Sequence, residues 1–231
     1  DEFFWAATEL YLATGDMKYY TAMAPHLVEA SVPGWSDVAG LPWMSLAQHR
    51  DRLQVSDRSR VESGLQELAG QLTRQANASA YRVALQDEDL VWGSNAVALN
   101  QAMMLIQAYR VHADSSYLQA AQSLFDYVLG RNALATSFVT GHGVRTPMHI
   151  HHRPSVADGI EAPVPGLLSG GPNPGQQDKQ GCPVAYPSNL PAKSWLDHQC
   201  SYASNEIAIN WNAPLVYVAA ALQELTPAPV P

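Results

Sequence analysis

The chain has 231 residues, of which 47% are hydrophobic and 15% charged, and its formal net charge is −8. This composition indicates a globular domain with a sizeable core and excludes a disordered chain. The acidic charge is not clustered, which argues against nucleic acid or an anionic membrane as a partner. No apolar run reaches the roughly 20 residues of a membrane-spanning helix.

Apolar residues at helical spacing predict helices joined by short turns over residues 1–131. The expected helices cover 3–14, 19–30, 41–53, 59–81, 95–111 and 117–129. Ser94 is the expected N-cap of the fifth helix, and Gly130 is the expected C-cap glycine of the sixth. Residues 10–24 resemble residues 108–122, which suggests repeated helical hairpins in an α/α toroid or a solenoid.

Pro and Gly become frequent over residues 132–203. A loop of this length is normally functional or disordered, and its Trp, Tyr, His and Arg residues favour an ordered binding loop. A final, mostly apolar helix is expected over 204–225, where Pro214 should kink or interrupt it. An extended tail is expected over 227–231. We interpret 1–231 as part of one all-α domain.

The two cysteines, Cys182 and Cys200, lie 18 residues apart in this loop-rich region. A disulfide between them would contribute roughly 3 kcal/mol on the loop-entropy model and would indicate an oxidising compartment. Two free thiols are the alternative.

Two carboxylates near the C-terminus are candidates for acid–base chemistry. Glu206 lies at the start of the expected apolar helix, where poor solvation would raise a carboxyl pKa and suit a general acid. The alternative is a solvent-exposed Glu that stabilises the helix dipole. Asp197, nine residues earlier, would orient a sugar hydroxyl or assist a second carboxylate, or would be an ordinary turn residue.

Four histidines, His142, His149, His151 and His152, precede Arg153. Their spacing matches no zinc pattern, so hydrogen bonding to sugar hydroxyls is the favoured interpretation, with the Arg153 guanidinium fixing the geometry.

Four aromatic residues near the same loops are candidate stacking platforms for sugar rings, with a core position as the alternative for each: Trp92, Trp195, Tyr202 and Trp211.

Two segments, 137–153 and 195–213, resemble the signatures of glycoside hydrolase family 9, a family mostly of endoglucanases. The first matches at Ser137, Val139, Thr140, Gly143, Arg145, Ile150, His151 and Arg153, and the second at Trp195, Asp197, Tyr202, Glu206, Ala208, Asn212 and Ala213. The resemblance covers the whole chain and is strongest from about Trp92 onward.

The resemblance implies an (α/α)6 barrel and inverting hydrolysis of β-1,4-glucosidic bonds. It implies that Glu206 is the general acid, that Asp197 is a second site carboxylate and that His151 acts beside them. It makes His151 and Arg153 sugar-binding residues and places Trp92 and Trp211 among the aromatics that line the cleft. His152 and Tyr202 are further candidate substrate-binding residues.

The main departure from the family pattern is that the motif carrying the catalytic base is not found in this sequence. Family members carry it in an Asp-rich DAGD motif in the first half of a domain about twice this length, whereas Gly15-Asp16 ends a helix here. The chain also lacks an initial Met and a signal peptide. We therefore expect a C-terminal half, inactive alone, whose partner is the N-terminal half of the same domain.

The expected substrate is a β-glucan or cello-oligosaccharide, acted on by a secreted or periplasmic protein. No cofactor is expected to be required, and the resemblance allows a structural calcium that the sequence does not place. The alternatives are an exo-acting glycosidase on gluco- or glucosamine-type oligosaccharides and an inactive glycan-binding fragment. A terpenoid-cyclase-like toroid is disfavoured because no Asp-rich magnesium motif is found.

Overall fold

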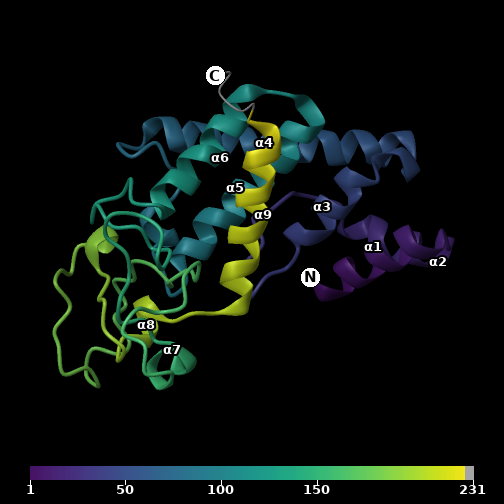
Figure 1. Ribbon diagram of the computed structural model, residues 1–231. Helices are drawn as coiled ribbons and strands as arrows, with labels where there is room; N and C mark the ends of the chain where they lie inside the picture. The colour runs from purple at the N-terminus through teal and green to yellow at the C-terminus, as the bar shows by residue number, and fades with distance from the viewer. Residues whose placement is uncertain (227–231) are drawn as a thin grey trace.

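The computed structural model describes residues 1–226, and its regular structure is helical (Figure 1). The α-helices are α1 (Glu2–Thr14), α2 (Met17–Met23), α3 (Gly40–Gln48), α4 (Val55–Ala78), α5 (Ser94–His112), α6 (Ser115–Val128), α7 (Arg153–Ala157), α8 (Tyr202–Asn205) and α9 (Ile209–Leu225). Short 3-10 turns are η1 (Ala24–His26), η2 (Arg50–Arg52), η3 (Asp87–Asp89) and η4 (Pro191–Lys193). The tail predicted over 227–231 lies outside the described residues.

Helix α5 is the centre of the molecule. It packs against α4, α6 and α9, and α9 crosses in front of it in Figure 1. Leu99, Leu105 and Ile106 on α5 are fully buried, and burying each such side chain contributes about 1.5–3 kcal/mol. The α5 core therefore provides a firm base for the loops beyond its N-terminal end, at the lower left of Figure 1.

The internal sequence resemblance corresponds to two similarly built helical hairpins, α1–α2 and α5–α6. In each, the first helix ends at a left-handed residue, Gly15 (φ 70°) or Ala113 (φ 53°). The residue directly after it, Asp16 or Asp114, caps the second helix. Its side chain accepts a hydrogen bond from the backbone N–H two residues later. The carboxylate satisfies an N–H that has no partner within the helix.

Several predicted helix ends were wrong. Helix α2 stops at Met23 instead of continuing to residue 30, because Pro25 has no N–H to continue the ladder. Helix α4 starts four residues before the predicted Ser59. Gly93 (φ 89°) caps α5, whereas Ser94 is its first helical residue and donates its hydroxyl to Pro172 O at 2.8 Å.

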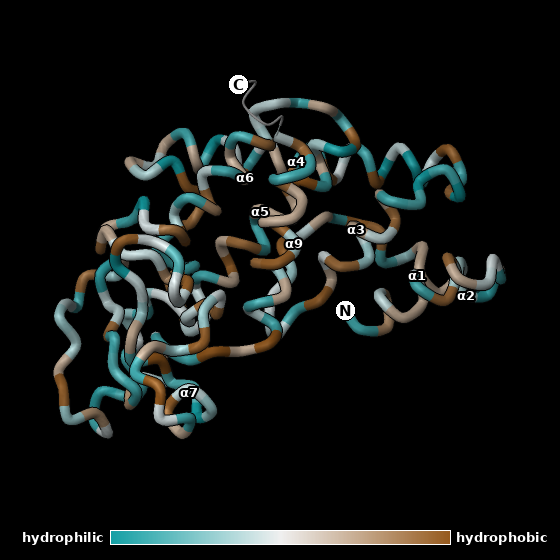
Figure 2. Tube along the Cα trace, in the orientation of Figure 1, coloured by the Kyte–Doolittle hydropathy of each residue, from teal (hydrophilic) through white to brown (hydrophobic). Residues whose placement is uncertain are grey.

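The prediction of one continuous final helix over 204–225 was also wrong. This segment instead contains the end of α8, an extended break at 206–208, and α9. The interruption does not occur at Pro214, as predicted, because Pro214 lies inside the continuous helix α9. In Figure 2, hydrophobic residues alternate with hydrophilic ones along the helices and along the loops. The final segment thus starts in the loop region and returns to the apolar core.

Candidate active site

A small patch of paired extended backbone holds the break at 206–208. Glu206 lies between His151 on one side, in a parallel bridge, and the 168–171 segment on the other. Gly170 N–H donates to Glu206 O at 3.0 Å, and His151 N–H donates to Asn205 O at 2.9 Å. These bonds replace helical hydrogen bonds, which is the physical reason that the expected helix is interrupted here.

The carboxylate of Glu206 is half-buried and faces an indole. Its Oε2 accepts a hydrogen bond from Trp92 Nε1 at 3.1 Å. The backbone of Glu206 is extended, with φ −69° and ψ 153°. Its predicted position at a helix start was therefore wrong, since it precedes α9 by three residues. The side chain is instead oriented by the bridges around it and by Trp92.

An apolar cavity of about 490 Å³ opens beside this carboxylate and is lined by Trp35, Trp92, Glu206, Ala208, Asn210 and Trp211. Trp92 is 42% exposed, while Trp211 is only 7% exposed. Gly93 and Gly170 make room for the Trp211 ring, because a Cβ on either would come within about 3 Å of it: 2.9 Å at Gly93 and 3.1 Å at Gly170. Trp92 is thus the accessible indole beside Glu206, and Trp211 supports the wall behind it.

Tyr202 extends this aromatic surface from α8. Its ring centre lies 5.2 Å from that of Trp92 and 6.1 Å from that of His151. Trp195, by contrast, is buried against Phe138 and donates its Nε1–H to Ser169 Oγ at 2.9 Å. The structure therefore brings Trp92, Tyr202 and His151 together near Glu206 and places Trp195 in the core.

Trp35 is a lining residue that the sequence prediction missed. It is 87% exposed, immediately after the Pro33-Gly34 break, and lines the same cavity as Trp92. A Trp in a non-helical connection is a signal for a surface role, because connecting segments lie on the surface and frequently bind ligands.

Asp197 fixes the segment that carries the histidines. Its two oxygens accept the backbone N–H groups of Met148 at 2.9 Å and His149 at 2.8 Å, and Asn205 Nδ2 donates to it at 3.2 Å. A carboxylate with three donors holds the 148–149 backbone against the residue before Glu206.

The two histidines that follow have different partners. His151 Nδ1 lies 2.6 Å from Gln199 O; a carbonyl oxygen only accepts, so Nδ1 carries the proton and Nε2 is left as the other ring nitrogen for contacts. His152 Nδ1 is bonded to Ser155 Oγ at 2.9 Å. Arg153 begins α7 with an exposed side chain. His151 is therefore the histidine that adjoins Glu206 directly.

A disulfide joins Cys182 to Cys200, with their Cα atoms 5.3 Å apart. Cys200 directly follows Gln199, whose carbonyl holds His151. The covalent link thus ties the 183–199 loop to the base of the site.

Within residues 1–226, no group of three or more His, Cys, Asp or Glu side chains is arranged to hold a metal ion, so a structural calcium remains a prediction. None of the helices described here combines the length and apolar character needed to cross a bilayer.

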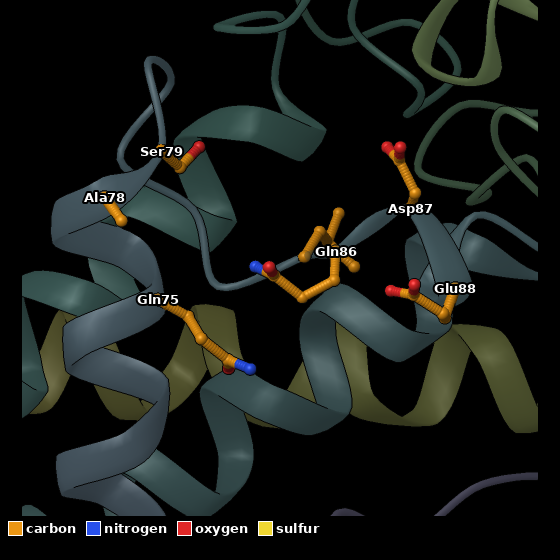
Figure 3. Close-up of a pocket in the computed structure, with 7 residues that line it drawn as sticks. Gln75, Ala78, Ser79, Gln86, Asp87 and Glu88 are labelled. Carbon is orange, nitrogen blue, oxygen red and sulfur yellow. The ribbon is translucent and has the colours of Figure 1, made fainter.

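A second cavity, of about 400 Å³, lies between the end of α4 and the 85–88 turn (Figure 3). No predicted site residue lines it.

A helical scaffold that presents a half-buried carboxylate beside indole rings is typical of a glycoside hydrolase site. The family model described as glycosyl hydrolase family 9 matches residues 1–219, and the chain belongs to this family.

Two curated relatives and one solved structure illustrate the similarity. A xyloglucan-specific endo-beta-1,4-glucanase of Bacteroides ovatus is 41% identical over 97% of this chain and 39% of its own length. A cellulose 1,4-beta-cellobiosidase of Acetivibrio thermocellus is 33% identical over 97% of this chain and 28% of its own length. A Bacteroides ovatus family 9 structure has a TM-score of 0.86 and 36% identity, over 97% of this chain and 40% of that one. The predicted family and (α/α)6-barrel fold class are confirmed, and the chain spans well under half the length of these relatives.

Proposed function

We propose that this chain supplies the general acid and one wall of the substrate cleft in an inverting β-1,4-glucanase. One observation supports the proposal most strongly: the Glu206 carboxylate is held 3.1 Å from Trp92 Nε1 at the edge of the indole-lined cavity. Glycosidic cleavage needs an acid to protonate the leaving oxygen and flat rings against which the sugars stack. The names of the two relatives described above are those of enzymes that act on β-1,4-linked glucans.

In this proposal Glu206 donates its proton to the glycosidic oxygen while a sugar ring stacks on Trp92, Trp35 or Tyr202. His151 and Arg153, with His152 behind them, donate hydrogen bonds to sugar hydroxyls. Asp197 acts through the backbone of 148–149 and keeps this binding segment beside the acid.

The base that activates water is proposed to lie in the part of the family 9 domain outside residues 1–231. An inverting site needs two carboxyl groups roughly 6.5–9.5 Å apart, with the water between them. The chain matches only 39% of its 41%-identical relative, which leaves room for that second carboxylate elsewhere. The isolated chain is therefore expected to be inactive.

The remaining helices of the same domain are the proposed partner. Ile209 and Val216 are exposed and lie on one face of the core helix α9, which supports a covering element from the rest of the domain. A secreted or periplasmic location is proposed from the polymeric substrate and the disulfide, and no cofactor is required by the acid–base mechanism.

The test is Glu206→Gln in the complete catalytic domain. A glutamine keeps the shape of the side chain but has no proton to give, so turnover of cellopentaose should fall roughly 10²–10⁴-fold while binding, measured by calorimetry, is retained. A glycan-binding protein without catalysis would show no turnover before the change and little effect after it. Product lengths over time would separate endo from exo action.

A further inference from the structure

A buried polar network contacts α8, and its residues do not line the indole cavity. Asp178 is 2% exposed. Its Oδ2 accepts from Ala203 N–H at 2.6 Å, and its Oδ1 accepts from the Tyr186 hydroxyl at 2.7 Å. No Lys or Arg within residues 1–226 forms an ion pair with Asp178. A buried carboxylate without a cation is costly unless hydrogen bonds satisfy it, so these two donors are essential to its position.

Tyr186 extends the network to both ends of α8. Its hydroxyl lies 2.8 Å from Ser201 Oγ and 3.3 Å from Ser204 Oγ, and these two hydroxyls are 2.8 Å apart. Burial raises the pKa of Tyr186 to about 12, so the hydroxyl remains a donor at neutral pH. Tyr186 comes from the loop that the disulfide closes.

Helix α8 has only four residues and carries two site groups. Tyr202 opens it, and Glu206 directly follows it. A helix this short has almost no internal hydrogen bonding of its own, so its position depends on external partners. Asn173 Nδ2 adds one by donating to Ala203 O at 2.8 Å. Contacts from 173–186 thus hold α8 in place.

We propose that Asp178 and Tyr186 are positioning residues that fix α8 and so aim the Glu206 carboxylate at the leaving-group oxygen. This inference rests on the proposed role of Glu206 as the acid. Neither residue lines the indole cavity, and neither is among the residues that the sequence predicted for the site. Small displacements of a catalytic group are costly, since a shift of about 1 Å can reduce the rate roughly 100-fold.

Three substitutions separate positioning from simple packing. Tyr186→Phe keeps the ring but removes the hydroxyl, which leaves Asp178 Oδ1 without its donor. Asp178→Ala removes both acceptors. Asp178→Asn is the conservative variant: its Oδ1 can still accept from Ala203 N–H, and its amide N–H can donate to the Tyr186 oxygen, which then donates to Ser201 or Ser204. Asp178→Asn should therefore recover most of the activity that Asp178→Ala loses.

The test compares two substrates in the complete catalytic domain: cellotetraose, whose leaving oxygen needs protonation, and 2,4-dinitrophenyl β-cellobioside, whose leaving group departs without it. If the pair positions the acid, Tyr186→Phe should lower kcat on cellotetraose by roughly 10-fold or more and kcat on the aryl glycoside by less than about twofold. A merely structural role would lower both rates together.

Tyr217→Phe is the matched control. It also removes a hydroxyl that is hydrogen-bonded to a buried partner, Gln107, but on α9 away from the cleft, and it should leave both rates unchanged. Equal loss on both substrates, or no loss on either, would overturn the proposal for Tyr186. Glu206→Gln, assayed in parallel, tests the proposed function separately: if it shows no preference for the aryl glycoside, the acid assignment itself is wrong.

Discussion

Gly171 packs closely against the start of helix α5, and its replacement gives a quantitative test. Its φ is +100°, and a Cβ built on it would lie 2.5 Å from Asn95 Cγ and 2.6 Å from Ser94 Oγ. The same two side chains hold the segment: Ser94 donates to Pro172 O and Asn95 donates to Ser169 O, each at 2.8 Å. Gly171→Ala therefore pushes the 169–172 segment away from α5.

The expected cost has two parts. A non-glycine residue at positive φ costs roughly 1–2 kcal/mol, and forcing a methyl group into packed surroundings costs about 1–3 kcal/mol. The sum is about 2–5 kcal/mol. Gly159→Ala is the matched control, because Gly159 also has a positive φ, +75°, but nothing lies within 4 Å of its Cβ position. It should lose only the first part.

The assay is urea denaturation followed by Trp fluorescence, with activity of the complete domain measured alongside. Gly171→Ala should be less stable than Gly159→Ala by about 1–3 kcal/mol. It should also lower kcat, since Gly171 N–H donates to Ser204 O, two residues before the proposed acid Glu206. Equal stabilities for the two variants, or a Gly171→Ala domain with full activity, would refute the claim that α5 sets the position of the Glu206 segment.

Three further outcomes are expected. Trp92→Phe removes the N–H that Glu206 accepts and should lower kcat on cellopentaose by roughly 10-fold or more, because the carboxylate loses the donor that orients it; an unchanged kcat would contradict this. Replacing Cys182 and Cys200 by Ser should lower the free energy of unfolding, measured by urea denaturation, by roughly 3 kcal/mol, because the cysteines are 18 residues apart. An unchanged free energy of unfolding would contradict this. Burial raises the pKa of Tyr186, so the folded state favours its neutral form. The stability that Tyr186 contributes should therefore decline as pH rises above about 10, and the difference in free energy of unfolding between wild type and Tyr186→Phe should shrink there. A constant difference from pH 8 to 11 would disprove this.

The helical half of the fold was well predicted from sequence because its signals are local. Spacing located each major helix, and the Asp16 and Asp114 caps lie within two residues of the groups they bind. The errors occurred where distant residues decide. Ser94 is a good cap by local propensity, yet its hydroxyl bonds to Pro172, 78 residues away.

The candidate site shows the same division. Motif resemblance identified Glu206, but its extended conformation depends on Gly170 and His151, which no local pattern connects to it. The contacts of Asp178 and Tyr186 with each other and with α8 could not be predicted, because a single Asp and a single Tyr in a Pro/Gly-rich loop carry no periodic signal.

The stereochemistry of the first product tests the central claim of an inverting mechanism most directly, in which an acid, proposed to be Glu206, protonates the leaving oxygen while a second carboxylate activates water. Proton NMR during cellopentaose hydrolysis by the complete domain should show the α-anomer first, because water attacks from the face opposite the leaving group. Initial release of the β-anomer would contradict this account, since retention requires a nucleophilic carboxylate only roughly 5–5.5 Å from the acid.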